Sequence, residues 1–348
     1  MRGVVVPTSN AEEAAVVEGL EVVGASSLDE VVGFFRGTWR SRLPEAAGPV
    51  EDPRHAVDFA EVRGQAQARR ALEVAAAGGH NVLMVGSPGA GKTMLARRLA
   101  TILPPLSRDE SLEVTQLHSV AGLLEGGLIR ERPFRSPHHT VSPAALLGGG
   151  TAFLRPGEVS LAHHGVLFLD EFTEFRRDAV EGLRQPLEDG RVVVTRMAGS
   201  VVFPSRFTLV AAANPCPCGF AGDVARRCSC REDRLQTYIA KLTGPLLDRV
   251  DIQLVIPRLT RQELLGEQPG ESSSAVRKRV EVARSRQQSR YAELGFRSNS
   301  QLPGHVARRE ARISKDARDL LASAVDLHGL TGRGFDRTLK VARTIADL

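Results

Sequence analysis

The sequence predicts an α/β fold in which helices cover both faces of a parallel sheet. Two observations support that prediction: helical patterns alternate with runs of strand length, and those runs are continuously apolar. Between residues 58 and 262, helical patterns alternate with apolar runs of strand length, at Val82–Val85, Val166–Leu169, Thr208–Ala212 and Ile252–Ile256. Strands that are buried on both faces read as continuous apolar runs of this kind. Residues 271–348 show helical patterns only, rich in Arg, Ala and Leu, so we expect a separate helical lid over 263–348.

A glycine-rich run follows the first of these strands and precedes a helical pattern over 94–103. It satisfies the phosphate-loop pattern G-x-x-x-x-G-K-[ST], in which backbone N–H groups and a helix N-terminus surround phosphate oxygens. We expect Lys92 to neutralise the β and γ phosphates and the Thr93 hydroxyl to bind Mg²⁺. The nucleotide-binding residues predicted here are Gly86, Ser87, Pro88, Gly89, Ala90, Gly91, Lys92, Thr93 and Met94.

A second apolar strand ends in two adjacent acids, Asp170 and Glu171. The carboxyl ends of parallel strands meet at one edge of the sheet, so these acids are expected to face the phosphates. We expect Asp170 to bind Mg²⁺ through water, and Glu171 to orient and polarise the attacking water. The sequence has no Asn-Lys-x-Asp motif for guanine. The predicted reaction is therefore hydrolysis of ATP, with Mg²⁺ as cofactor.

Composition favours a multi-part protein with an anionic partner. The 348 residues exceed one typical domain, and a 42% hydrophobic content is enough to build cores. The net charge of +5 suits a nucleic acid, although nucleotide binding could account for part of it. No apolar stretch approaches the ~18 residues of a membrane span, and the N-terminus lacks the apolar core of a signal peptide. We therefore expect a cytoplasmic protein without a membrane partner.

The remaining segments lie before the core. Residues 1–43 carry apolar strand-like and helical pieces that are too few to close a core alone, and residues 44–57 have the Pro, Gly and acid content of a linker. The predicted organisation is thus 1–43, a linker 44–57, an ATPase core 58–262 and the lid 263–348.

The paired histidines His138-His139 and His163-His164 are expected to serve packing rather than metal binding.

All four cysteines lie in one short window, as Cys216-Pro-Cys218 and Cys228-Ser-Cys230. Two pairs of thiolates in a compartment that disfavours disulfides suggest a tetrahedral structural Zn²⁺ knuckle, with all four ligand positions filled. The C-x-C spacing is tighter than the usual gap of two to four residues. Disulfides or free thiols are the alternatives.

Several longer segments together resemble one family. They are 58–65, 75–81, 135–140, 214–219 and 242–251. In combination they look like the magnesium-chelatase-related AAA+ ATPases of the ComM/YifB type, over nearly the whole chain. The resemblance implies a phosphate-loop AAA+ core with a C-terminal helical lid. Residues 1–43 are similar to the end of that family's Lon-protease-like (ChlI-type) N-terminal domain, most of which would be missing, and the lid would be truncated at Leu348.

The resemblance also assigns roles to single residues. Asn214 matches the sensor-1 position, whose amide contacts the γ-phosphate or attacking water, although an Asn before a proline can simply open a turn. Arg249 matches the arginine finger, which acts on a neighbouring subunit's site; an isolated arginine would more often form a surface ion pair. Arg333 matches the sensor-2 arginine, with Arg337 as second choice. Gly64 and Gln65 match nucleotide-binding positions.

Two insertions point towards a macromolecular partner. Residues 119–158 and the predicted hairpin 190–203 look like the inserts that project into the central pore of the family's rings. Arg135, Arg191 and Arg196 are then candidate contacts to a DNA backbone, which would give salt-sensitive binding without sequence preference. Alternatively, the hairpin packs on the core and its arginines are solvated.

The resemblance therefore implies a homo-hexameric ring that hydrolyses ATP between subunits and moves or remodels single-stranded or branched DNA, as a branch-migration helicase does. Two alternatives stay open. One is a chelatase-like motor subunit that drives metal insertion through a protein partner. The other is a truncated, non-catalytic nucleotide-binding module.

Overall fold

The structure is a computed structural model that describes residues 3–15, 17, 19–40, 57–124, 127–150, 153–196, 199–223, 226–242, 246–261, 263 and 270–348. They form two compact units, residues 1–55 with 106–131 and residues 56–105 with 132–348, and each unit is described by itself. Residues 44–56 of the predicted linker lie outside the described residues.

A parallel five-stranded sheet forms the centre of the second unit, in the order β11-β3-β10-β7-β4. Its strands are β3 (Val82–Gly86), β4 (Phe134–Arg135), β7 (Val166–Leu169), β10 (Thr208–Ala213) and β11 (Ile252–Ile256). Every residue of β7 and β10 is buried, as the continuous apolar runs predict. The predicted α/β class is confirmed. Strand β4 was not expected, because its two residues are too few to show a strand pattern.

Helices cover this sheet and enclose the main core. α3 (Ala66–Gly78) and α4 (Lys92–Ile102) pack against the sheet, and α12 (Ser273–Tyr291) packs over both helices. Leu72 of α3 and Leu95 and Leu99 of α4 are completely buried. Each leucine buried in this way stabilises the fold by about 1.5–3 kcal/mol relative to an exposed one. The core therefore fixes α4, whose first residue is Lys92, directly after the third strand of the chain.

The insertion expected at residues 119–158 and the hairpin that follows β7 contain several short helices and strands. The insertion contains α6 (Pro143–Leu147), β5 (Gly148–Gly149), β6 (Arg155–Pro156) and α7 (Glu158–Leu161). After β7 come η4 (Phe172–Glu174), α8 (Arg177–Gly182), α9 (Arg184–Asp189) and the antiparallel pair β8 (Arg191–Arg196) and β9 (Gly199–Pro204). The predicted hairpin is thus present.

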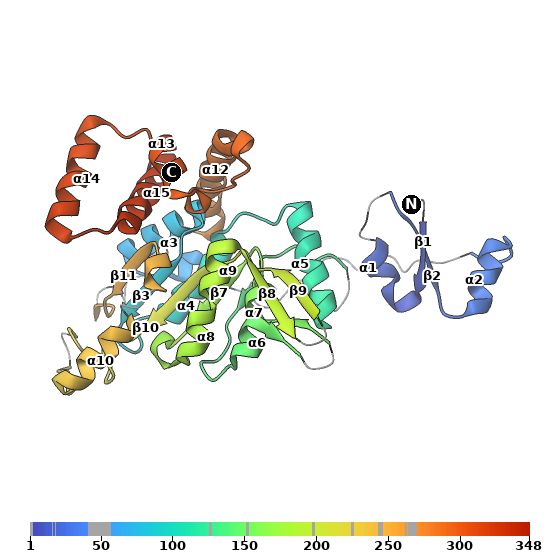
Figure 1. Cartoon of the computed structure of the whole chain (residues 1–348), viewed down its shortest axis with the longest axis horizontal. Helices are drawn as coiled ribbons and strands as arrows, with labels where there is room; N and C mark the ends of the chain where they lie inside the picture. The colour runs from blue at the N-terminus through green and yellow to red at the C-terminus, as the bar shows by residue number, and fades with distance from the viewer. Residues whose placement is uncertain are drawn as a thin grey trace. The chain divides into compact units, whose positions relative to one another are not determined.

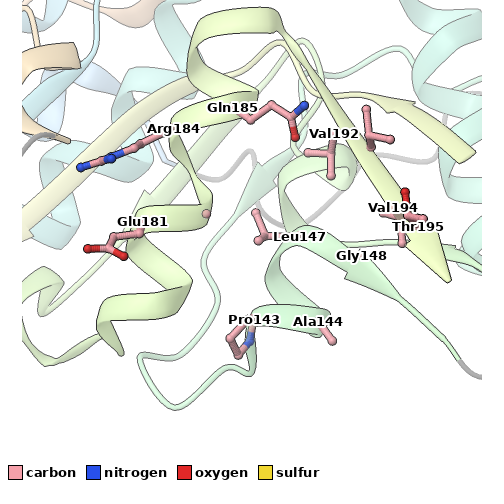
Figure 2. A pocket seen from close by; sticks show the side chains of 12 residues that line it. Pro143, Ala144, Leu147, Gly148, Glu181, Arg184, Gln185, Val192, Val194 and Thr195 are labelled. Atoms are coloured by element: carbon pink, nitrogen blue, oxygen red, sulfur yellow. The ribbon is translucent and has the colours of Figure 1, made fainter. Parts of the chain in front are cut away.

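One face of the hairpin packs inward and the other faces solvent. Val192 and Val194 are buried, whereas Val193, Val201 and Val202 are exposed. A groove of about 430 Å³ runs between α6, the α8–α9 segment and β8 (Figure 2). The valines of β8 alternate between buried and exposed, as in a strand with one covered face, whereas Val201 and Val202 of β9 are both exposed.

The C-terminal part is entirely helical, as predicted. After α12 come η6 (Ala292–Leu294), η7 (Asn299–Gln301), α13 (Gly304–Glu310), α14 (Lys315–His328) and α15 (Gly332–Asp347). These helices lie together at one end of the unit (Figure 1). Two more elements, α10 (Glu232–Leu242) and η5 (Leu247–Arg249), connect β10 to β11, and η3 (Phe59–Glu61) precedes α3.

The first unit contains a small parallel pair, β1 (Gly3–Pro7) and β2 (Glu21–Ala25), with η1 (Thr8–Asn10) and α1 (Ala11–Ala15) between them. Then follow α2 (Leu28–Phe35) and, later in the chain, α5 (Arg108–Ala121), which begins with a capping box at Ser107. Leu28 and Phe35 are 77% and 74% exposed, so α2 buries little of its apolar surface. Among the described residues, no helix combines the length and the apolar character needed to cross a bilayer.

Candidate functional site

The candidate site lies where the parallel strands of the central sheet end. The phosphate loop follows β3, Asp170 and Glu171 follow β7, and Asn214 follows β10. β10 lies between β3 and β7 and pairs in parallel with both. The carboxyl ends of the three strands therefore meet at one edge, and the predicted residues are gathered there from positions up to 128 residues apart in sequence.

The phosphate loop holds its lysine directed inward. The Lys92 ammonium donates hydrogen bonds to the backbone oxygens of Gly86 (2.6 Å) and Ser87 (3.1 Å) and to Oδ1 of Asn214 (3.2 Å). Gly91 adopts a left-handed φ of 90°, which lets the chain turn into α4 with its amides facing the loop. Burial lowers the pKa of Lys92, and the charges of Asp170 and Glu171 oppose that shift. The loop therefore presents a cation and amide donors to a phosphate.

Two oxygen donors for a hard cation lie beside the loop. The Thr93 hydroxyl donates to Oδ2 of Asp170 over 2.7 Å, and the Glu171 N–H donates to Oδ1 of Asp170 over 3.0 Å. Magnesium prefers such oxygen ligands and keeps several waters, so few protein donors are needed. This donor set fits Mg²⁺ bound to a nucleotide phosphate.

Glu171 stands in an unusual backbone conformation, with a left-handed φ of 51°. Such positions cost about 1–3 kcal/mol and occur where the surrounding structure imposes them, frequently at functional sites. Its carboxylate is 57% exposed and lies 3.1 Å from Nδ1 of His139. Sequence reasoning missed His139, for which only packing was expected. No sequence signal links the two residues, because only the pairing of β4 with β7 brings their segments together.

A turn before α3 contributes a buried amide. Gln65 Nε2 donates to the backbone oxygen of Ala90 in the phosphate loop over 2.8 Å. Its Oε1 is buried and has no hydrogen-bond partner within the described part of the chain. An unsatisfied buried acceptor is costly and suits a donor on a ligand, such as the amino group of a nucleobase. Gly64 precedes it in the same turn, and its contact with the nucleotide stays a prediction.

The predicted arginine finger, Arg249, lies at the opposite edge of the sheet, where the parallel strands begin. Asn81, directly before β3, donates from Nδ2 to the backbone oxygen of Arg249 over 2.9 Å, while the Arg249 side chain pairs with Glu188. The five residues of β3 span roughly 16 Å, at ~3.3 Å each. Within one chain, therefore, Arg249 is separated from Lys92 by the length of the strand.

The two lid arginines join Arg249 at this edge. Arg337 donates from Nη1 to the backbone oxygens of Leu247 (2.8 Å) and Val250 (2.6 Å), which flank Arg249. Arg333 lies 3.8 Å from Asp248 and is 66% exposed. The structure thus groups Arg333 and Arg337 with Arg249 and not with the phosphate loop.

The three candidate DNA contacts differ in their surroundings. Arg135 makes a bidentate ion pair with Glu158, from Nε to Oε2 over 2.6 Å and from Nη2 to Oε1 over 2.8 Å. Its guanidinium therefore already has a partner within the chain. Arg191 is exposed at the start of β8. Arg196 ends β8, and its side chain lies outside the described residues.

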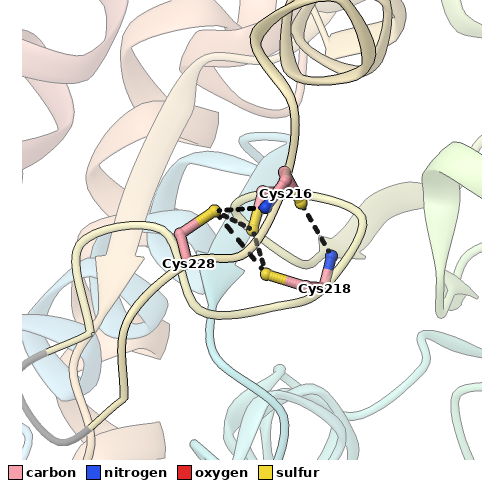
Figure 3. Close-up of side chains that lie close together, drawn as sticks. Cys216, Cys218 and Cys228 are labelled. Atoms are coloured by element: carbon pink, nitrogen blue, oxygen red, sulfur yellow. Dashed lines mark hydrogen bonds between the residues drawn. The ribbon is translucent and has the colours of Figure 1, made fainter.

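The four cysteines converge between β10 and α10 (Figure 3). Cys216 Sγ lies 3.3 Å from Cys218 Sγ and 3.7 Å from Cys228 Sγ, and the latter two atoms are 3.6 Å apart. A disulfide needs about 2.05 Å, whereas the sulfurs of a zinc tetrahedron with ~2.3 Å bonds are ~3.8 Å apart. Together with Cys230, all four sulfurs lie within 4.8 Å of one another.

Backbone amides point at these sulfurs. The N–H of Ala221 donates to Cys216 Sγ and the N–H of Cys218 to Cys230 Sγ, at 3.2 and 3.3 Å. Hydrogen bonds from the backbone of Ser229 and Phe220 lower the pKa of the Cys218 thiol to about 6, whereas desolvation and hydrogen bonds with the neighbouring sulfurs raise the pKa of Cys228 and raise that of Cys230 to about 12. The convergence of four sulfurs, rather than these pKa values, is what fits a tetrahedral cation.

Comparison with known proteins places this geometry in a family. Residues 58–264 match the magnesium chelatase subunit ChlI, and residues 270–348 match the C-terminal region of that subunit. An uncharacterized protein of Mycobacterium tuberculosis is 48% identical over 99% of this chain and 68% of its own length. YifB of Escherichia coli is 41% identical over 100% of this chain and 67% of its own length. The competence protein ComM of Haemophilus influenzae is 39% identical over 100% of this chain and 68% of its own length. The chain therefore belongs to the magnesium-chelatase-related AAA+ family, together with YifB and ComM.

Proposed function

We propose that this protein hydrolyses ATP with Mg²⁺. The observation that carries the proposal is the Thr93–Asp170 contact of 2.7 Å beside a lysine that reaches Asn214. Bound ATP and Mg²⁺ would supply the transferable phosphoryl group and neutralise charge on it. Lys92 holds the phosphates, Thr93 and Asp170 hold the cation, and Glu171 accepts a proton from the attacking water. Asn214 orients that water or the γ-phosphate.

The active form in this proposal is an oligomeric ring, with hexamers as the expected size. Arg249 sits a strand's length from Lys92 of its own chain, so it can act only on the site of a neighbouring copy. A guanidinium supplied from outside stabilises the charge that spreads over the transferred phosphoryl group. The grouping of Arg333 and Arg337 around the Arg249 loop supports the same assignment, because it brings the lid next to Arg249.

The work done with ATP in this proposal is movement along single-stranded or branched DNA. Three observations support it: a net charge of +5, exposed Arg191 on the hairpin, and 39% identity to a protein named competence protein ComM. Backbone contacts of this kind give affinity without sequence preference. The Arg135–Glu158 pair favours a structural role for Arg135 over a DNA contact.

A chelatase-like motor is the second candidate, and the family match to a chelatase subunit favours it. The experiment that separates the two compares ATP turnover of the full chain alone, with single-stranded DNA, with a four-way DNA junction, and with a chelatase catalytic subunit. Stimulation by DNA supports the helicase. Stimulation by the catalytic subunit alone overturns it. A chain without turnover in any mixture is a nucleotide-binding module.

The four cysteines hold a structural Zn²⁺ in this proposal. The sulfur separations of 3.3–3.7 Å among Cys216, Cys218 and Cys228 are too long for a disulfide and close to those of a filled tetrahedron, and the amides that point at the sulfurs are typical of the shell around bound thiolates. A filled site leaves no position for a substrate, so the ion acts on structure alone. Metal analysis of purified protein tests this directly.

A further inference from the structure

The cysteine knuckle lies between two segments that build the candidate nucleotide site. Cys216 comes two residues after Asn214 and is completely buried. Cys230 comes two residues before α10, whose Tyr238 donates from its hydroxyl to the backbone oxygen of Asn214 over 3.1 Å. The knuckle therefore ties together both ends of a loop that leaves the site at Asn214 and returns to it at Tyr238.

Tyr238 extends this connection to the segment that follows the paired acids. The Thr173 hydroxyl, two residues beyond Glu171, donates to the Tyr238 hydroxyl over 2.9 Å. Lys241 of the same helix donates to the backbone oxygen of Thr173, also over 2.9 Å. α10 thus braces Asn214 on one side and the turn after Glu171 on the other.

The knuckle also touches the phosphate loop. Gly219 has a left-handed φ of 85°, and a Cβ placed on it would lie 2.7 Å from Cδ of Pro88. The backbone of the knuckle therefore approaches the ring of Pro88 as closely as only a glycine allows. Phe220, next along the chain, lies under the guanidinium of Arg258, 5.9 Å from the ring centre. Arg258 in turn pairs with Asp223 at 3.0 Å, which fastens the knuckle to the residues after β11.

From these contacts we infer that Zn²⁺ bound by the knuckle strengthens nucleotide binding and raises the rate of turnover, because it holds Asn214 and Pro88 in position. The inference rests on the proposed function for the metal and the nucleotide. Without the ion, four thiols crowded within 4.8 Å lose the bond that holds the loop closed. Asn214 and Pro88 then lose the support that fixes them against the phosphates, whereas Lys92 keeps its bonds to Gly86 and Ser87 and Asp170 keeps its contact with Thr93. Cys216, Cys218, Cys228 and Cys230 are positioning residues and not catalytic ones.

The test uses the full-length chain with Cys228→Ser, because Cys228 is exposed and its replacement leaves no buried cavity. Ser229→Ala is the matched control, since Ser229 is an exposed neighbour that contributes only its backbone. Three quantities are measured: zinc per chain by mass spectrometry, affinity for a fluorescent ATP analogue, and ATP turnover. We expect about one zinc in the wild type and in Ser229→Ala. Cys228→Ser should lose the metal, bind the analogue several-fold more weakly and turn over ATP about tenfold more slowly.

A second variant guards against simple misfolding. Gly219→Ala keeps all four cysteines and should keep zinc, but it pushes against Pro88 and should weaken analogue binding in the same way. Combining Cys228→Ser with Asn214→Ala should lower turnover by less than the product of the two single losses, because part of the effect of Cys228→Ser passes through Asn214. Thermal melting of each variant checks that the fold persists.

The outcomes separate the inferences. A wild type without zinc overturns the metal site and the coupling together. Zinc loss in Cys228→Ser with unchanged analogue affinity and turnover overturns the coupling and leaves the metal site standing. Zinc-dependent analogue binding in a protein that never turns over ATP supports the coupling while the proposed hydrolysis fails.

Discussion

The charged groups at the two edges of the central sheet have different kinds of contact partners. At the carboxyl edge, Lys92, Thr93 and Asp170 contact one another or the loop around them, as the proposed phosphate and cation site requires. At the amino edge, Arg249, Arg333 and Arg337 are held by acids and backbone oxygens, far from that site. The contrast teaches that Arg249 cannot reach Lys92 of its own chain across the length of the strand. It supports the proposed composite site, in which a second copy would bring the two groups together.

The largest effect is expected at Glu171. Glu171→Gln should lower ATP turnover about a thousandfold, because an amide cannot accept the proton of the attacking water. Binding of ATP should persist, since the lysine and the cation ligands are unchanged. Phosphate release and analogue titration measure the two quantities. Glu174→Gln, at an exposed position three residues on, is the control and should behave as wild type. Equal turnover in Glu171→Gln and wild type would remove Glu171 from its role.

Arg249→Ala comes second, with an expected loss of about a hundredfold in turnover and little change in ATP affinity. Mixing it with Lys92→Ala subunits should restore part of the activity, because each variant then supplies the half that the other lacks. The measurement is turnover against mixing ratio. Arg177→Ala removes an exposed arginine paired with Glu181 and serves as the control. Mixtures without any recovery would contradict a site shared between chains.

The third prediction concerns substitutions of Arg337 and Arg333 at the amino edge of the sheet. Arg337→Ala removes two charge-assisted hydrogen bonds to the loop that carries Arg249, each worth about 1.5–3 kcal/mol, so both turnover and melting temperature should fall. Arg333 is 66% exposed, and Arg333→Ala should leave the melting temperature unchanged. If Arg333 acts on a neighbour's nucleotide, turnover falls without any change in melting. If turnover also stays at the wild-type level, Arg333 has no part in the reaction.

The smallest effect concerns DNA. Arg191→Ala should weaken binding to single-stranded DNA of any sequence and reduce the slope of log affinity against log salt by about one unit. Fluorescence anisotropy over a salt series gives that slope. Arg135→Ala should leave the slope unchanged, since Arg135 is paired with Glu158. A steeper loss for Arg135 than for Arg191 would reverse the two assignments.

Much of the carboxyl edge could be predicted because its residues carry local signals. The spacing of Gly86, Lys92 and Thr93 defines a phosphate loop in eight residues, and Asp170 and Glu171 directly follow a continuous apolar run. Parallel strands of such a sheet end on the same side, so the meeting of these segments follows from the fold class. His139 could not be found in this way. Its contact with Glu171 depends on a two-residue strand, which leaves no pattern in the sequence.

The sequence by itself determined the fold class, the phosphate loop, the paired acids and the window of four cysteines, because each of these is written in short-range spacing. Only the tertiary structure decided that Arg249 and the lid arginines lie a strand's length from Lys92, and that the cysteine knuckle rests on Pro88 through Gly219. Such relations depend on which strands become neighbours and where the loops between them return. That order is set by packing of the whole core, and no local run of residues records it.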